Sequence, residues 1–260
     1  MPDALIRGRR VHYERAGSGP LVVLLHGIGG GVGSWREQFA ALADAFTLVA
    51  WDLPEWPGAA DGTPTMADYA DDLAAFLDHL QATSAHLLGI SMGGVLALEF
   101  YGRHPARVRS LVLADTYRGG GTMPEPERSA RLARRLAASE GRDLADMARE
   151  RAPQLFSPHA DPALVREAAA TMAAIPPAGY RQRAIALAHA DTSAVLPHVA
   201  VPTLVIWGDQ DSVLPCADSE ALRDGIRGAA LVILPGAGHA SNQERPAEFN
   251  AAVRRFWRAH

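Results

Sequence analysis

The apolar positions of this chain form short continuous runs that alternate with segments of helical spacing. Residues 21–25 are all apolar and end at a glycine-rich stretch, as expected for a strand buried on both faces of a parallel sheet. Five further runs of this kind are residues 46–50, 85–88, 108–114, 203–207 and 231–234. The segments with helical spacing are residues 34–43, 66–80, 91–103, 217–227 and 246–257. This alternation predicts an α/β fold with a mostly parallel, doubly wound sheet.

Two segments depart from the alternation. Residues 5–15 alternate weakly around Gly8, which predicts an antiparallel hairpin ahead of the first core strand. Residues 118–196 are rich in Ala, Arg and Glu and have helical patterning. They follow the carboxyl end of a strand, where such sheets hold active sites, so we expect a helical cap there. The predicted division is a core of residues 1–117 and 197–260 and a cap of residues 118–196; a helical insertion without a function is the alternative.

The amino-acid composition excludes several kinds of reaction and binding site. The chain has 260 residues, 48% hydrophobic and 21% charged, close to the averages of soluble folded domains. All 25 basic residues are arginines against 29 acidic residues, and the absence of lysine excludes Schiff-base chemistry and a Walker A phosphate site. The chain has no run of basic residues long enough to indicate a nucleic-acid partner. The single cysteine, Cys216, and the lack of metal-ligand spacings indicate neither a disulfide nor a metal site.

The first residues lack the basic region and apolar stretch of a signal peptide. No run of about 20 apolar residues occurs later in the chain, so no membrane partner is expected. Together with the single cysteine, this predicts a cytoplasmic protein; a homo-oligomer is left open.

A serine is the predicted nucleophile. Ser91 lies in a Gly-x-Ser-x-Gly motif, residues 89–93, between a buried strand and a helical pattern. On such a tight turn the serine hydroxyl is exposed at the helix N-terminus, and the glycines let strand and helix approach. The backbone N–H of Met92 would then face the oxyanion of an acyl-transfer intermediate. A loop that only caps the helix is the alternative.

A second oxyanion donor is expected in the loop after the first core strand. Residues 26–31 form this loop and are mostly glycine, which exposes backbone N–H groups. We assign the donor to Ile28 and a substrate contact to Gly27. His26 is interpreted as a structural histidine that bonds the loop backbone.

Serine needs a base and a group that orients the base. Of the ten histidines, His239 follows a late core strand in a loop of small residues and is the predicted base. The loop after the preceding strand offers Asp209 and Asp211 as the orienting acid. Asp115, at the end of the strand of residues 108–114, is a third candidate.

The chain order of serine, acid and histidine is that of the α/β-hydrolases. The sequence resembles the α/β-hydrolase superfamily along nearly its whole length, through residues 25–27, 51–54, 89–94, 104–108, 207–215 and 235–239. The resemblance implies the α/β-hydrolase fold and selects Asp211 as the acid, which leaves Asp209 to a local Asx turn. Residues 175–181 and 238–246 are most similar to the 3-oxoadipate enol-lactonase and small carboxylesterase branch.

The resemblance implies hydrolysis of a small-molecule ester or lactone through an acyl-enzyme, with no metal or organic cofactor. The second candidate is a carbon–carbon bond hydrolase of vinylogous diketones. Those enzymes usually carry Asn before the serine and Trp after the histidine, where this chain has Ile90 and Ala240. A candidate of another class is a slow-turnover ligand receptor on the same fold.

Substrate contacts are predicted from position along the chain. Trp56 lies in residues 52–58, where the family usually has a glycine-rich loop, and is a candidate to reach the pocket; a bulkier surface loop is the alternative. Arg118 lies just past a strand end and is expected to bind a substrate carboxylate. Arg131, Arg134 and Arg135 are expected to form a solvated helix face.

Overall fold

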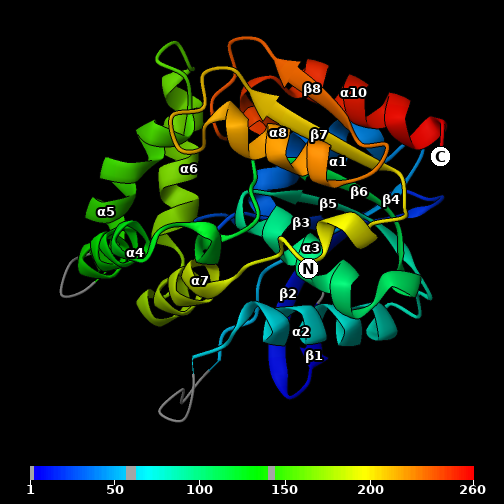
Figure 1. The fold of residues 1–260 in the computed structure, drawn as a ribbon, viewed down its shortest axis with the longest axis horizontal. Coiled ribbons are helices and arrows are strands. Elements are labelled where there is room, and N and C mark those ends of the chain that lie inside the picture. The colour runs from blue at the N-terminus through cyan, green and yellow to red at the C-terminus, as the bar shows by residue number, and fades with distance from the viewer. Residues whose placement is uncertain (1–2, 57–62, 140–143) are drawn as a thin grey trace.

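The computed structural model describes residues 3–56, 63–139 and 144–260. Within these residues, eight strands form one sheet in the order β1-β2-β4-β3-β5-β6-β7-β8, with helices on both faces (Figure 1). The strands are β1 (Asp3–Ile6), β2 (Arg9–Ala16), β3 (Leu21–Leu25), β4 (Thr47–Trp51), β5 (Ala85–Ile90), β6 (Val108–Ala114), β7 (Thr203–Gly208) and β8 (Ala230–Leu234). The doubly wound α/β fold predicted from the sequence is confirmed.

The pairing of the strands explains why the sheet is mostly parallel. The six predicted core strands pair in parallel from β4 to β8. The predicted hairpin, β1 and β2, turns at Gly8, whose φ is +81°. It is not separate from the sheet, because β2 pairs antiparallel with β4, with Tyr13 opposite Trp51. The hairpin therefore extends the six-stranded core to eight strands.

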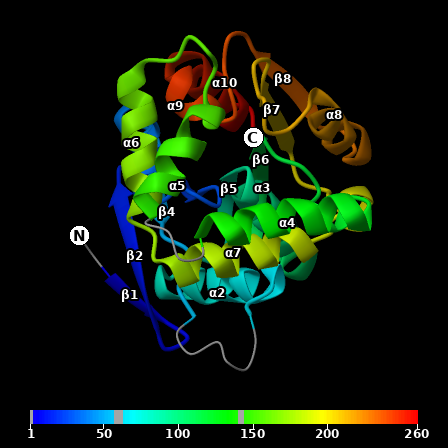
Figure 2. The ribbon, with the colours of Figure 1, turned by 90° about the vertical axis from the view of Figure 1, so that its left-hand side faces the viewer.

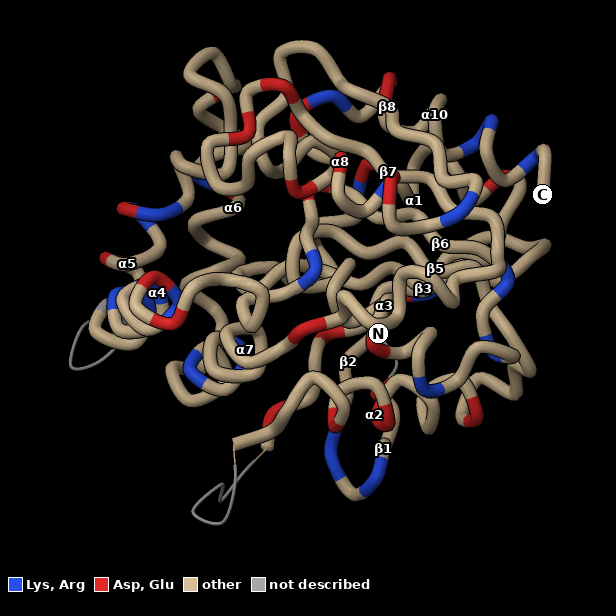
Figure 3. Tube along the Cα trace, in the orientation of Figure 1, with Lys and Arg blue, Asp and Glu red and all other residues tan. Residues whose placement is uncertain are grey.

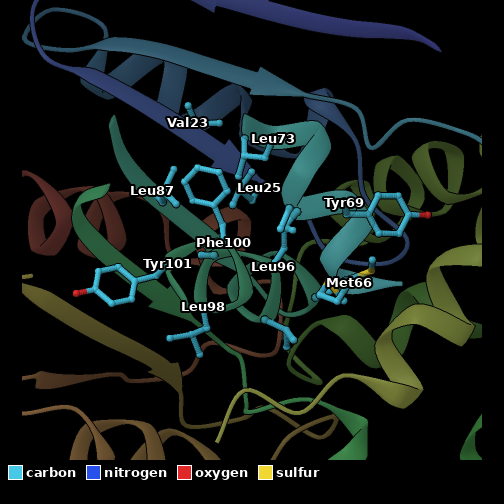
Figure 4. Close-up of a cluster of buried hydrophobic side chains, with 14 of the residues drawn as sticks. Val23, Leu25, Met66, Tyr69, Leu73, Leu87, Leu96, Leu98, Phe100 and Tyr101 are labelled. Carbon is cyan, nitrogen blue, oxygen red and sulfur yellow. The ribbon is translucent and has the colours of Figure 1, made fainter. Parts of the chain in front are cut away.

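Two layers of helices cover the sheet. The helices of the core are α1 (Arg36–Leu42), α2 (Met66–His79), α3 (Met92–Arg103), α8 (Cys216–Gly225), α9 (Ser241–Glu244) and α10 (Pro246–Arg258). Side chains alternate along β3: Val22 and Leu24 pack in the cluster of α1 and α10, whereas Val23 and Leu25 pack in the cluster of α2 and α3. Figure 4 shows Val23 and Leu25 beside Phe100 on the second of these faces. This two-sided burial is why the strands read as continuous apolar runs.

Between β6 and β7, the described part of residues 118–196 forms helices and no strand. They are α4 (Glu125–Ser139), α5 (Leu144–Arg151), α6 (Pro162–Ala173) and α7 (Pro177–His189). In Figure 2 these four helices lie together on the side that faces the viewer. Helix α4 packs against α7 and α5 against α6. We call this segment the helical insertion; its residues 140–143 lie outside the described residues.

Short 3-10 turns link the main elements: η1 (Val32–Trp35), η3 (Pro105–Arg107), η4 (Gly120–Thr122), η5 (Ala152–Leu155) and η6 (Leu196–His198). Acidic and basic positions are interspersed along the described chain (Figure 3). No helix in this described part has both the length and the apolar character needed to cross a bilayer.

Candidate active site

Three predicted residues meet at the carboxyl ends of the parallel strands. Ser91 follows β5, Asp211 lies after β7 and His239 lies after β8. His239 Nε2 is 2.9 Å from Ser91 Oγ, and His239 Nδ1 is 2.8 Å from Asp211 Oδ2. With the carboxylate ionised, Nδ1–H donates to it and the serine O–H donates to Nε2. The structure therefore joins the three side chains in one hydrogen-bond chain.

The backbone at Ser91 is strained, with φ +55° and ψ −120°. A positive φ is uncommon for a residue with a side chain and persists where its surroundings enforce it. A Cβ on Gly89 would lie 2.2 Å from the carbonyl oxygen of Gly93, and one on Gly93 would lie 1.9 Å from that of Leu25. Both positions therefore require glycine, because α3 begins directly against β3 and β5.

The predicted oxyanion loop lies beside the nucleophile. A Cβ on Gly27 would be 3.3 Å from Ser91 Cβ, and Gly27 and Ile28 line the same cavity as Ser91. Met92 is the first residue of α3, so its N–H has no acceptor one turn earlier in the helix. The N–H of Ile28 thus lies on a loop and that of Met92 at the start of a helix, and both elements adjoin Ser91.

His26 holds this loop in place. Its Nδ1 lies 2.7 Å from the carbonyl oxygen of Gly27, and the N–H of Leu53 donates to its Nε2 at 3.1 Å. Burial, with a smaller contribution from the charge of Arg183, lowers the pKa of His26 to about 4. The ring is therefore neutral, with Nδ1–H as the donor and Nε2 as the acceptor. The structural role predicted for His26 is confirmed.

Arg183, on α7, connects the helical insertion to the same loop, a role that sequence reasoning missed. Its buried guanidinium donates to the carbonyl oxygens of Ile28 and Gly30 at 3.4 Å and of Leu53 at 3.3 Å. Burial lowers its pKa. Arg183 therefore fixes the loop from the insertion side, while His26 fixes it from the core.

The two aspartates after β7 have distinct roles. Asp211 Oδ1 accepts from the N–H groups of Val213 at 2.7 Å and Leu214 at 3.0 Å, which leaves Oδ2 for the histidine. Asp209 Oδ1 instead accepts from the N–H of Gly236 at 2.7 Å, in the loop before the histidine. The prediction of a local Asx turn at Asp209 was wrong. The local turn forms at Asp211, and Asp209 bridges two loops because they pack side by side.

Asp115 joins the loops that carry the acid and the histidine. It is fully buried, and its Oδ2 accepts from Ser241 Oγ at 2.5 Å and from Ser241 N at 3.3 Å. Its Oδ1 accepts from the N–H of Gly208 at 2.9 Å. The adjacent Thr116 Oγ1 donates to the carbonyl oxygen of Ser91 at 2.6 Å. Asp115 and Thr116 thus link the turn at Ser91 to the segments that carry Asp211 and His239. Asp211 itself lies beside the histidine.

The buried carboxyl of Asp115 predicts a pH effect on stability. Burial raises its pKa to about 7, above that of the unfolded chain, so the folded protein binds the extra proton between these values. This contribution to stability is complete below pH about 4 and is lost as the pH rises to about 7. Replacement of Asp115 by Asn is therefore expected to stabilise the protein progressively, relative to wild type, across this window. Urea unfolding at several pH values measures the difference.

Asp209→Asn is the matched control for that experiment, because Asp209 is exposed. A difference between Asp115→Asn and wild type that stays constant with pH would contradict the expected titration.

Ser91 and His239 open onto a cavity of about 80 Å³. Its core side includes Gly27 and Ile28. The helical insertion contributes residues from all four helices and from η5: Arg135, Arg151, Leu155, Met172 and Tyr180. The insertion therefore covers the nucleophile and encloses the site.

Two predicted substrate contacts do not line this cavity. The Arg9 guanidinium lies 3.9 Å above the Trp56 ring, and Gln182 bonds the Trp56 backbone in both directions. The carbonyl oxygen of Arg118 accepts hydrogen bonds from Thr192, and the positive charge of Arg118 acts on the carboxyl group of Asp218. The end of the Trp56 loop, residues 57 and 58, lies outside the described residues.

The prediction that Arg131, Arg134 and Arg135 form a solvated helix face is wrong for Arg135. Arg134 is exposed and Arg131 half-buried, but Arg135 is only 6% exposed and lines the cavity. Arg135 follows Leu132 by one helical turn, and both border a small gap against Ala188 of α7. That spacing from an apolar residue was the available signal. Packing of α4 on α7 turns the side chain inward.

Comparison with known proteins places the chain in a family. Residues 20–246 match the family model described as the alpha/beta hydrolase fold. The 3-oxoadipate enol-lactonase 2 of Acinetobacter baylyi is 31% identical over 245 residues, which cover 90% of this chain and 87% of that protein. The enol-lactonase of Burkholderia xenovorans superposes with a TM-score of 0.89 at 26% identity, over 98% of this chain and 99% of that one. The chain belongs to the α/β-hydrolase family.

A second structure narrows the class of enzyme. The malate-bound thermophilic esterase of Thermogutta terrifontis superposes with a TM-score of 0.89 at 27% identity, over 99% of this chain and 98% of that one. The protein is thus an esterase or lactonase, a hydrolase of small carboxylic esters or lactones, in the branch of the 3-oxoadipate enol-lactonases. The predicted family and branch are confirmed.

Proposed function

We propose that the protein hydrolyses its ester or lactone through a covalent acyl-enzyme on Ser91. The hydrogen-bond chain from Asp211 through His239 to Ser91 supports this proposal most directly. As Ser91 Oγ attacks the substrate carbonyl, His239 Nε2 takes the hydroxyl proton, and Asp211 stabilises the resulting imidazolium. The N–H groups of Ile28 and Met92 donate to the oxyanion that forms.

The same groups complete the reaction. The tetrahedral intermediate collapses, its bond to the leaving oxygen breaks, and His239 returns the proton to that oxygen. Water then attacks the acyl carbon with His239 as the base, which releases the acid and regenerates Ser91. For a lactone, the leaving oxygen stays on the acyl chain, so the product is a single hydroxy acid. The chain's own groups supply each step.

The cavity favours an ester or lactone over a vinylogous diketone. Ile90 and Ala240 both line it, at the positions where carbon–carbon bond hydrolases usually carry Asn and Trp. Neither an aliphatic side chain nor a methyl group can donate a hydrogen bond to a substrate oxygen. The enclosed site and its small volume indicate a small-molecule substrate.

A phosphonate ester tests the covalent step. Methyl 4-nitrophenyl butylphosphonate mimics the tetrahedral intermediate and is expected to release one 4-nitrophenol per chain and leave the phosphonyl group on the peptide that contains Ser91. Hydrolysis of 4-nitrophenyl butyrate should disappear in parallel with labelling. Unlabelled enzyme is expected to turn this ester over many times, which separates an enzyme from a slow receptor. Full activity in completely labelled protein, or a label on another residue, would contradict the proposal.

A further inference from the structure

Glu244 joins the loop that carries His239 to the helical insertion. It is half-buried at the end of α9, the short helix that follows the histidine. Its Oε2 accepts from the N–H of Gly238, the residue before the histidine, at 2.7 Å, and from the N–H of Ser157 in the insertion at 3.0 Å. Its Oε1 accepts from the same Ser157 N–H at 3.2 Å and from the Ser157 hydroxyl. One carboxylate therefore bonds both segments.

The histidine loop and the insertion are also in direct backbone contact. A Cβ on Gly238 would lie 2.6 Å from the carbonyl carbon of Phe156, so the two chains leave no room for a side chain at position 238. On the other side of the histidine, the N–H of Ala240 donates to the carbonyl oxygen of Leu155 at 2.8 Å. Both chain neighbours of His239 are thus held against the insertion.

The chemistry of the junction suits a carboxylate. The groups of Gly238 and Ser157 that face Glu244 are donors, and an ionised carboxylate is an acceptor with two oxygens. Hydrogen bonds to a charged acceptor are about twice as strong as neutral ones. Glu244 therefore restrains the histidine loop more firmly than a neutral side chain would.

This restraint bears on the reaction because the base tolerates little displacement. His239 Nε2 lies 2.9 Å from Ser91 Oγ, within the range of a hydrogen bond. A displacement of about 1 Å in a reacting group costs up to about 10²-fold in rate. The bonds that fix the backbone on either side of His239 therefore affect how well the ring takes the proton.

We propose that Glu244 is a positioning residue: its bonds to Gly238 and Ser157 hold His239 at its distance from Ser91, so that the helical insertion sets the geometry of the base. The role of His239 as the base rests on the proposed function, whereas the restraint of its ring by Glu244 does not. In the described structure Glu244 does not line the cavity, so it acts through the loop and not on the substrate. The insertion thus has a second role besides covering the site.

Kinetics of three variants test this role with 4-nitrophenyl butyrate. Glu244→Ala is expected to lower kcat by about 100-fold, with KM within about threefold because the bond from Ala240 to Leu155 still attaches the insertion. Glu244→Gln should stay within about tenfold of wild type in kcat, because its oxygen accepts from both N–H groups and its amide donates to the Ser157 hydroxyl. Glu248→Ala, which removes an exposed acid on α10, should change neither constant.

A double-mutant cycle tests the link to the insertion. Ser157→Ala removes the hydroxyl but keeps the N–H, and should lower kcat by less than about tenfold. Combined with Glu244→Ala, it should cause no further loss, because the hydroxyl acts through that carboxylate. Thermal unfolding shows whether each variant is folded. Losses that simply add would contradict the link.

The ring proton of His239 gives a readout that needs no turnover. NMR of isotope-labelled histidine observes the Nδ1 proton, which lies in the 2.8 Å hydrogen bond to Asp211, and the signal is assigned by its loss in His239→Gln. We expect this proton to exchange faster with water in Glu244→Ala than in wild type, because the loop opens more often. Glu244→Gln should restore slow exchange.

The outcomes are distinct. A folded Glu244→Ala with kcat within threefold of wild type, a loss confined to KM, or a glutamine variant as impaired as the alanine variant would overturn the positioning role. Faster exchange of the His239 proton in Glu244→Ala, in a protein that cleaves no ester, would support the restraint and contradict the proposed function.

Discussion

Replacement of Ser91 by alanine is expected to lower kcat for a small ester by about 10⁶-fold, as in other triads that lose the nucleophile. The reason is that Ser91 Oγ is the nucleophile at the end of the hydrogen-bond chain from Asp211 through His239. Alanine at the strained turn has the same backbone cost as serine, so the melting temperature should stay close to that of wild type. Steady-state kinetics with 4-nitrophenyl butyrate, with the limit set by enzyme concentration, measures the loss.

Ser34→Ala is the informative control for this loss. Ser34 lines the same cavity, but it is hydrogen-bonded to the backbone of Gly31 rather than to His239. Its replacement should change kcat by less than about tenfold, the value of one weak neutral hydrogen bond. If Ser91→Ala kept more than a hundredth of the wild-type rate while folded, a water attacking directly would have to replace the acyl-enzyme.

The strands of the core and the turn at Ser91 were predictable because each is determined by residues close together in the sequence. A strand buried on both faces must be apolar at every position, and the run of residues 21–25 shows this directly. The turn at Ser91 needs glycine at positions 89 and 93, because backbone atoms occupy the space that a Cβ would fill. The Gly-x-Ser-x-Gly motif in the sequence therefore indicates this close packing of strand and helix. Successive parallel strands then place Asp211 and His239 at the same edge as Ser91.

The contacts of the insertion were not predictable in this way. Arg135 lies on a helix rich in charged residues, which resembles a solvated face until α7 packs against it. Trp56 and Arg118 lie near strand ends along the chain, yet the Trp56 ring lies beneath the Arg9 guanidinium and neither residue lines the cavity. Chain position sets where a loop starts, whereas packing of distant helices sets where its side chains point.

Asp211→Asn is expected to lower kcat by about 10⁴-fold because it changes the tautomer of His239. The N–H groups of Val213 and Leu214 both donate to Asp211 Oδ1, so an asparagine keeps its oxygen there and turns its amide group toward His239. The amide N–H then donates to Nδ1, which moves the ring proton to Nε2. An Nε2–H cannot accept the proton of Ser91, so the base is lost while the geometry remains.

The other two aspartates near the site test this explanation against a general loss of charge. Asp209→Asn keeps an acceptor for Gly236, and Asp115→Asn keeps one for Gly208, so neither changes the tautomer of His239. We expect kcat within about tenfold of wild type in both, because the hydrogen bonds that change, at most the two from Ser241 to Asp115, do not involve His239. A loss of about 10⁴-fold in Asp115→Asn with near-normal activity in Asp211→Asn would identify Asp115 as the acid partner of His239 instead. The distances favour Asp211, since its Oδ2 lies 2.8 Å from His239 Nδ1, whereas the oxygens of Asp115 are taken by Ser241 and Gly208.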